Sequence, residues 1–209
     1  DMINQGKLPG RARLVVSGAM ANDRYEGASG FQLYNFNLPA DDWTYEILRD
    51  AAAPFPLHHA RRADKIFALT PGYYLDYTDT YQYKKQLPAT VEEGTAKVLT
   101  IPVGEDYSNP ARKAAVEYCA VRLGFKKEFA EGDWEMELQA NGMVLHNGPV
   151  AEKLVKTEGA LVYFQTPIRD MAVLKQGKNT LRIVISGIPR VELAEVLIGV
   201  FFREHDLSL

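Results

Sequence analysis

Carboxylates are the side chains of this sequence best suited to catalysis. Hydrolysis of a glycosidic bond uses two carboxyl groups roughly 5–10 Å apart across the sugar. The candidates are Asp41, Asp42, Asp76, Asp79, Glu105 and Asp106. No spacing singles out a pair, because Asp41 and Asp42 suit the start of a helix, where acidic side chains are favourable, and Glu105-Asp106 follows a strand as a polar turn. The sequence therefore predicts no catalytic residue in this chain.

Metal-binding side chains are present but scattered. His58 and His59 are adjacent and would point in opposite directions on an extended segment, which favours a surface loop, and the other two histidines are isolated. Asp76 and Asp79 in "DYTD" faintly resemble a calcium-binding loop without the remaining ligands. We therefore expect no cofactor, with a structural calcium ion as the weaker alternative.

Two widespread catalytic and phosphate-binding signatures are not fulfilled. The segment "KQGKNT" (175–180) contains the Gly-Lys pair of a phosphate-binding loop, but Ala172 stands where the loop needs glycine and Asn179 where it needs Ser or Thr. This segment is predicted to be a hairpin turn. The sequence contains no GxSxG motif, which argues against a serine hydrolase.

Aromatic and amide side chains that suit sugar recognition lie in the N-terminal part of the chain. A pyranose ring stacks its apolar face on an exposed aromatic ring, and its hydroxyl groups bond to amides and carboxylates. The predicted carbohydrate-binding residues are Asn35, Asn37, Trp43, Tyr73, Tyr74 and Tyr77. Alternatively, the tyrosines of 73–83 are half-buried and hold two halves of the chain together, while the two asparagines only form turns.

Composition narrows the classes of partner. The 209-residue chain has a net charge of −3, so no basic face for nucleic acid is expected. No apolar run reaches the roughly 18 residues of a membrane helix, and no membrane partner is expected. The single Cys119 alternates with apolar residues, which predicts a buried thiol and excludes an internal disulfide. No signal peptide is visible after Asp1, a start that suggests a truncated or processed chain, so the localisation is unknown.

Apolar residues recur with a helical period in the N-terminal part of the chain and with a strand period after it. Residues 11–26 have the apolar spacing of a helix that ends at Gly27, residues 30–36 form a strand, and residues 40–52 return to a helix. An α-β-α order is typical of a parallel α/β layer.

From about residue 65 the apolar period changes to two. Strands are predicted within 96–106, 116–125, 134–142, 179–186 and 191–203. Asn-Gly at 141–142 and at 147–148 and the segment 175–179 are predicted turns, and Trp134 is predicted to lie in the core. Short alternating strands separated by such turns indicate an antiparallel β-sandwich.

Four stretches carry a resemblance to a known family. "EGASGFQLYNF" (26–36) resembles the last barrel strand of bacterial glycoside-hydrolase-like proteins, and the segment after it resembles the stretch that those proteins place behind the barrel. The hairpin at 141–142 and the pattern LKxGxNxLxI (174–183) resemble their closing domain. The resemblance implies a mainly β fold: an antiparallel jelly-roll β-sandwich of galactose-binding type at 65–209, after an α-β-α segment at 1–64 that resembles the end of a (β/α)8 barrel.

The resemblance also implies a function. Seven β/α units that such a barrel needs are missing before residue 11, and catalytic carboxylates sit mostly on those units. This chain alone is therefore expected to be a non-catalytic accessory region of a glycoside hydrolase that binds carbohydrate or braces the barrel. The alternative is an interaction module that forms a homo-oligomer through residues 11–55, because an orphan barrel strand needs its apolar faces covered.

Overall fold

The computed structural model of the chain describes residues 8–27, 64–69, 86–130 and 132–202. Sheet A consists of β1 (Lys65–Leu69), β2 (Ala89–Glu92), β4 (Val116–Lys126), β7 (Leu154–Glu158), β8 (Leu161–Pro167) and β10 (Arg190–Phe202). Sheet B consists of β3 (Lys97–Val103), β5 (Glu135–Ala140), β6 (Met143–Pro149) and β9 (Gly177–Ser186). The helices are α1 (Leu8–Tyr25), α3 (Pro110–Ala115) and α4 (Lys127–Ala130), with 3-10 turns η3 (Ala151–Lys153) and η4 (Met171–Val173).

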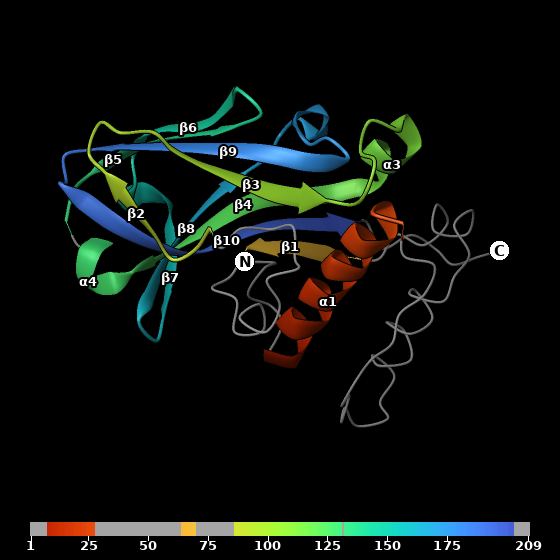
Figure 1. Cartoon of the computed structure of the whole chain (residues 1–209), viewed down its shortest axis with the longest axis horizontal. Coiled ribbons are helices and arrows are strands. Elements are labelled where there is room, and N and C mark those ends of the chain that lie inside the picture. The colour runs from red at the N-terminus through yellow and green to blue at the C-terminus, as the bar shows by residue number, and fades with distance from the viewer. Residues whose placement is uncertain (1–7, 28–63, 70–85, 131, 203–209) are drawn as a thin grey trace.

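The two sheets pack face to face as a β-sandwich (Figure 1). Sheet A has the strand order β1-β10-β4-β8-β7, and β2 also pairs with β10, whereas sheet B has the order β3-β9-β5-β6. All pairings between these strands are antiparallel. The prediction of a mainly β fold with antiparallel sheets is confirmed. The jelly-roll topology, the barrel-like N-terminal segment and the boundary between residues 64 and 65 stay predictions.

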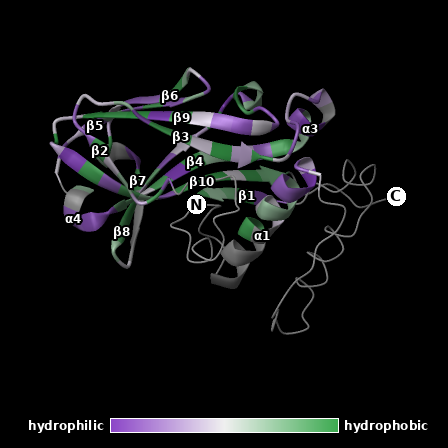
Figure 2. Ribbon diagram, viewed as in Figure 1, coloured by the Kyte–Doolittle hydropathy of each residue, from purple (hydrophilic) through white to green (hydrophobic). Residues whose placement is uncertain are grey.

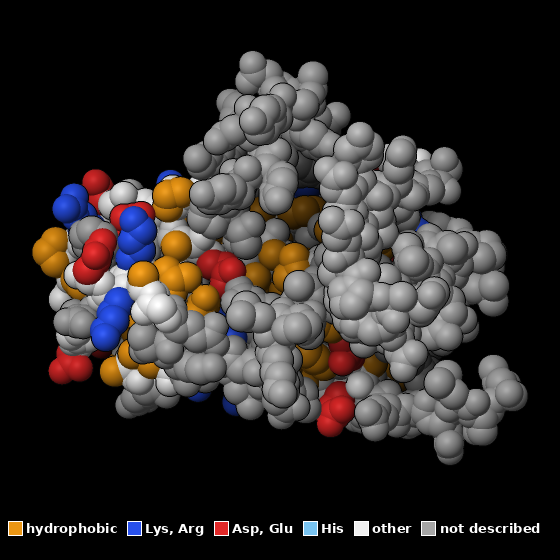
Figure 3. Space-filling model, turned by 90° about the horizontal axis from the view of Figure 1, so that it is seen from below, with side chains coloured by type: hydrophobic (Ala, Val, Ile, Leu, Met, Phe, Trp, Pro, Cys, Tyr) orange, Lys and Arg blue, Asp and Glu red, His pale blue; other side chains and the backbone are white. Residues whose placement is uncertain are grey.

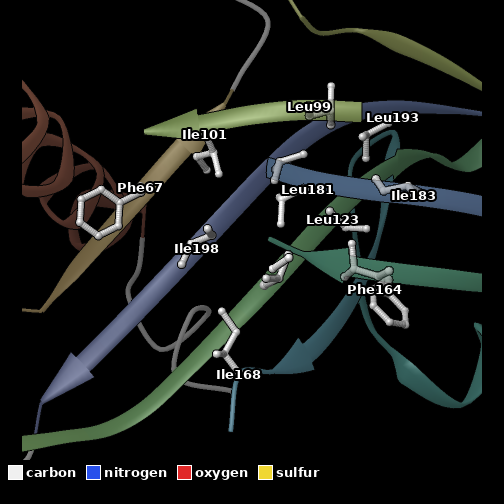
Figure 4. Packing of buried hydrophobic residues seen from close by; sticks show 14 of the residues in the cluster. Phe67, Leu99, Ile101, Leu123, Phe164, Ile168, Leu181, Ile183, Leu193 and Ile198 are labelled. Carbon is white, nitrogen blue, oxygen red and sulfur yellow. The ribbon is translucent and has the colours of Figure 1, made fainter. Parts of the chain in front are cut away.

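The core lies between the sheets and is built by strands with alternating side chains. In β9, Leu181, Ile183 and Ile185 are buried, whereas the residues between them are half-buried. Figure 4 shows Leu181 and Ile183 of sheet B and Leu123 and Ile198 of sheet A pointing into the same layer. Successive side chains of a strand point to opposite faces, so a strand with one buried face alternates in hydropathy, as Figure 2 shows along the strands.

The predicted strands are present, but two predicted turns are wrong. Strands β3 and β5 lie within two of the five predicted segments, and β4, β9 and β10 overlap the other three and extend beyond them by one or two residues. The hairpin turn predicted at 175–180 is wrong, because residues 177–180 already belong to β9 and the preceding strand, β8, lies in the other sheet. The hairpin at Asn141 and Gly142 is confirmed, with φ values of 49° and 85°. The turn expected at Asn147 and Gly148 is wrong, because both residues lie inside β6 and pair with β5. An Asn-Gly pair makes a two-residue turn when both residues take positive φ, which Asn147 does not.

Helix α1 covers part of the outer face of sheet A (Figure 1). Its Leu14 and Val15 pack against a buried cluster on that face that includes Ile66 and Leu197. The helix predicted over residues 11–26 is confirmed, and Gly27 follows it with a φ of 103°. The strand predicted at 30–36 and the helix predicted at 40–52 lie outside the described residues. The homo-oligomer through residues 11–55 stays a prediction.

Two glycines allow α1 to approach the strands closely. A Cβ atom on Gly18 would overlap the carbonyl group of Ile66 in β1. A Cβ atom on Gly104, just after β3, would overlap the backbone of Ala21 and Asn22 in α1. Because the atoms in the way belong to the backbone, a side chain at either glycine displaces the helix itself.

Asn179 is the buried side chain that holds the loop before β9. Its Oδ1 accepts hydrogen bonds from the Lys175 backbone N–H and from Asn141 Nδ2, each 2.8 Å long. Its Nδ2 donates to the carbonyl oxygens of Lys175 (2.8 Å) and Gly177 (3.0 Å). The asparagine of the LKxGxNxLxI pattern is thus fully buried with both ends of its amide bonded, and its role is structural.

Replacing Gly104 tests how closely α1 packs against the segment after β3. We expect Gly104→Ala to lower the free energy of unfolding by about 1–3 kcal/mol, because the added methyl group must push α1 away from β3. Urea denaturation measures this change. The control is Thr95→Ala at an exposed turn, which is expected to change stability by less than about 0.5 kcal/mol. Equal stabilities of the two variants would contradict the close contact.

Removing the Asn179 amide tests the loop before β9. We expect Asn179→Ala to lower the free energy of unfolding by about 2–3 kcal/mol, since it leaves buried backbone groups without partners. Lys178→Ala, at the exposed neighbouring position, serves as the control in the same denaturation series. A loss no larger than that of the control would show that water replaces the amide without cost.

Candidate functional site

The residues predicted to bind carbohydrate lie outside the described part of the chain. These are Asn35, Asn37, Trp43, Tyr73, Tyr74 and Tyr77. The same holds for His58, His59 and the carboxylates at 41, 42, 76 and 79. Their proposed roles therefore stay predictions.

Two side chains with potential chemistry belong to the core, as the sequence predicts. Cys119 is buried, and burial raises the pKa of its thiol to about 12, so that no thiolate forms at neutral pH. Trp134 is buried with its ring edge-on to Phe125, at 5.4 Å between ring centroids. Its indole N–H donates to the carbonyl oxygen of Ala130 at 3.2 Å. Neither side chain is available to a ligand.

Glu105 lies after β3 in the segment that the sequence predicts to be a polar turn, and its side chain is buried. Its Oε1 lies 3.1 Å from Lys65 Nζ in β1, and its Oε2 lies 3.6 Å from Arg112 Nη1 in α3. Oε2 also accepts a 3.0 Å hydrogen bond from the hydroxyl group of Tyr107. This Glu105 cluster fastens the loop after β3, and α3 with it, to sheet A.

The charges around Glu105 explain how a buried carboxylate is tolerated. Burial raises its pKa, but the positive charges of Lys65 and Arg112 and the hydrogen bonds from Lys65 and Tyr107 outweigh burial, so the pKa is lowered overall. Burial and the adjacent Glu105 raise the pKa of Tyr107 well above its usual value. Glu105 therefore stays ionised between two cations and has no proton to give. The cluster is structural and not an acid–base pair.

A second polar cluster lies on the outer face of sheet A. The Arg122 guanidinium lies 3.8 Å from the centroid of the Tyr163 ring, and Gln165 Nε2 donates to the Tyr118 hydroxyl group at 2.8 Å. Arg122 and Tyr163 are buried, so a ligand does not reach them. Figure 3 shows this side of the molecule, with hydrophobic side chains in view near its centre, a group of charged side chains at one end and a few acidic ones between.

An exposed aromatic ring lies at the end of the sandwich beside α1. Tyr25, the last residue of α1, is 48% exposed and is the one aromatic among the large exposed apolar side chains of the described residues. A Cβ atom on Gly177 would lie 2.7 Å from the Tyr25 hydroxyl oxygen, so the ring packs directly on that glycine. Gln176 Nε2 donates to the carbonyl oxygen of Gly104 at 3.0 Å. Three segments thus meet here: α1, the loop after β3 and the loop before β9.

We call the surface made of Tyr25, Asn22, Gln176 and Gly177 the Tyr25 surface. Asn22 precedes Tyr25 by three residues, which places both on one side of the helix. The Asn22 Oδ1 is buried and accepts no hydrogen bond in the described structure. A ligand therefore does not reach this oxygen. The surface combines an apolar ring with the exposed amide of Gln176.

Sequence reasoning missed the Tyr25 surface. It placed Tyr25 inside a helix that ends at Gly27, and a helix end by itself carries no signal of a ligand site. The signal lies in Gly104 and Gly177, which are far from Tyr25 in sequence and whose importance depends on how α1 packs.

The described residues offer neither a metal-binding cluster nor a membrane-spanning helix. Among the described residues, no three His, Cys, Asp or Glu side chains lie together in a group able to hold a metal ion. None of the described helices is long and apolar enough to cross a membrane.

Comparisons with known proteins give only distant likeness. No family model and no curated protein matches the chain. Similar solved structures include dimeric latent PorU from Porphyromonas gingivalis (13% identity, TM-score 0.35), which covers 66% of this chain and 12% of that one. BpGH86A, a beta-porphyranase of glycoside hydrolase family 86 from Bacteroides plebeius (13%, TM-score 0.35), covers 55% of this chain and 19% of that one. The match to a family 35 carbohydrate binding module from Clostridium thermocellum (13% identity, TM-score 0.33) covers 65% of this chain and 90% of that one.

This chain therefore spans less than a fifth of the length of the first two proteins. At such identities and TM-scores the likeness assigns neither a family nor a ligand to it.

The Glu105 cluster makes the folding stability of the chain depend on pH in the acid range. Because the pKa of Glu105 is lowered in the folded chain, its contribution is complete above the usual pKa of 4.5 and is lost as the pH falls through the lower folded value. We expect Glu105→Gln to destabilise the chain by about 3 kcal/mol near neutral pH, because Lys65 and Arg112 lose the negative charge between them. The difference from the unmodified chain should shrink as the pH falls below 4.5.

Urea denaturation of both proteins across the acid range measures this dependence. Glu135→Gln, at an exposed position of β5, is the control for removing one negative charge. A difference that is independent of pH would show that Glu105 does not act through its charge.

Proposed function

We propose that this chain is a non-catalytic, carbohydrate-binding accessory region, and that the Tyr25 surface takes part in binding. The observation that carries the proposal is the half-exposed ring of Tyr25, held on Gly177 beside the exposed amide of Gln176. The sandwich supplies no alternative chemistry in its described part, since its buried carboxylate lies between two cations and its thiol is buried.

The chemistry of the surface suits a sugar. The apolar face of a pyranose ring stacks on an aromatic ring, and this removes apolar area from water. Gln176 lies at an exposed position next to Gly177, and its amide offers an acceptor and a donor to sugar hydroxyl groups.

The sequence resemblance supports the finer parts of this proposal. The LKxGxNxLxI pattern, in which Asn179 and Gly177 shape the loop under Tyr25, resembles that of a galactose-binding-type jelly roll. The resemblance of "EGASGFQLYNF" to a barrel strand supports a place beside the catalytic barrel of a glycoside hydrolase. Within this proposal, Asn35, Asn37, Trp43, Tyr73, Tyr74 and Tyr77 are the predicted further contacts.

The test is affinity electrophoresis of the chain in gels that contain soluble polysaccharides, namely galactan, xylan, mannan and pectin. We expect retardation in at least one gel, and Tyr25→Ala should weaken this binding by about tenfold, which corresponds to about 1.4 kcal/mol. Tyr25→Phe keeps the ring and should retain most of the binding. Met143→Ala is the control, because Met143 is 45% exposed, similar to Tyr25, and lies on β6.

Two outcomes would overturn the proposal. Migration that none of the polysaccharides changes would remove the carbohydrate-binding function for these sugar classes. Equal retardation of Tyr25→Ala and the unmodified chain would show that the Tyr25 surface is not the site.

A further inference from the structure

The edge strands of the two sheets differ in how they are protected. An edge strand exposes unpaired backbone N–H and C=O groups, and proteins cover such edges, charge them or interrupt them with proline. Strand β1, at one edge of sheet A, has α1 packed closely against Ile66. Strand β2 lies on the same side and ends at Glu92, and Glu93 bridges to Ile185 of sheet B. The sequence of β7, at the other edge, is "LVKTE" and includes two charged residues.

Strand β3, at one edge of sheet B, is closed by a single side chain. The Gln86 amide accepts a 2.6 Å hydrogen bond from the Thr100 backbone N–H and donates a 2.8 Å hydrogen bond to the Thr100 carbonyl oxygen. Pro102 lies in the same strand and has no N–H group to offer. The amide of Gln86 thus takes the place of a neighbouring strand.

Strand β6, at the other edge of sheet B, has no comparable protection among the described residues. It pairs with β5 alone, and the stretch "NGMVLHNGPV" (141–150) contains no charged residue. Met143 and Val144 are 45% and 53% exposed, and they are two of the five large exposed apolar side chains of the described chain. An uncharged edge with exposed apolar residues is the kind of edge that pairs with another strand.

The hairpin geometry directs the free groups of β6 away from β5. The turn at 141–142 makes Ala140 and Met143 the pair that closes the hairpin, so the next residue, Val144, points its N–H and C=O groups outward. Farther along, Thr166 Oγ1 donates to the Leu145 carbonyl oxygen at 3.3 Å, at a bulge in the strand. The segment that remains open for pairing is short and centred on Val144.

We propose that β6 is an interface at which two copies of this chain join their B sheets edge to edge. An extended strand is the partner that fits these outward groups, because it presents donors and acceptors at the same repeat. A second copy of β6, related by a two-fold axis, pairs antiparallel and places the same surface on both sides. Since each chain carries a net charge of −3, two copies approach with least repulsion where the surface is uncharged.

This interface is separate from the Tyr25 surface and from the predicted oligomer through residues 11–55. The paired segment is short, so the dimer is weak and forms as the protein concentration rises. Joining two B sheets would give one continuous sheet across the dimer.

The experiment measures the mass of the full 209-residue chain by sedimentation equilibrium over a range of concentrations. We expect a shift from monomer to dimer, and Val144→Lys should weaken dimerisation by at least about tenfold, because two lysines would face one another across the axis. Val98→Lys is a closely matched control. Val98 is 55% exposed and lies on β3, the opposite edge strand of the same sheet, where Gln86 closes the edge. It should leave dimerisation unchanged.

Val144→Pro separates the backbone from the side chain. Proline removes the outward N–H group and leaves the bonds to β5 in place, so this variant should also remain monomeric. Thermal unfolding confirms that each variant is folded before its mass is compared. A monomer at all concentrations, or equal dimerisation of the unmodified chain and both Val144 variants, would overturn the proposal.

Discussion

The buried amide of Asn179 is the interaction on which the end of the sandwich depends. The loop between η4 and β9 lies outside the two sheets, so its backbone groups have no neighbouring strand and need other hydrogen-bond partners. Asn179 supplies the donors and acceptors that a neighbouring strand would otherwise provide. Gly177 then turns the chain with a φ of 95°, and its missing side chain leaves room for Tyr25. The position of the candidate ligand surface is set by this amide.

Helix α1 and the Glu105 cluster complete that end of the molecule by two different kinds of contact. At Gly18 and Gly104 backbone meets backbone, and the contact is steric. At Glu105 the contact is ionic, since Lys65 of β1 and Arg112 of α3 offset a buried carboxylate. Both contacts involve β1 or the loop after β3. The ring of Tyr25 therefore sits on a support fixed at several points, and a rigid support favours selective binding because little freedom is lost when a ligand arrives.

Local features of the fold were predictable from the sequence, and features that depend on distant partners were not. The strands could be located by alternation, as Leu181, Ile183 and Ile185 illustrate, because a strand with one buried face leaves that pattern within a few residues. The burial of Glu105 depends on Lys65 and Arg112, which the sequence does not place beside it. The two Asn-Gly pairs look alike in sequence, yet only the one at 141–142 lies where both residues take positive φ. The Tyr25 surface needs the packing of α1, which periodicity does not supply.

Strand β10 determines when sheet A can form during synthesis. Its 13 residues pair with β1, β2 and β4, so it holds sheet A together from within. All three partners leave the ribosome before β10, and β1 and β4 have no contact in the sheet without it. Sheet A is therefore completed only once the last described strand has been made. Until then the apolar faces of β1 and β4 are open to chaperones and to other nascent copies of the chain on neighbouring ribosomes. The same holds for other proteins whose strand pairings are distant in sequence.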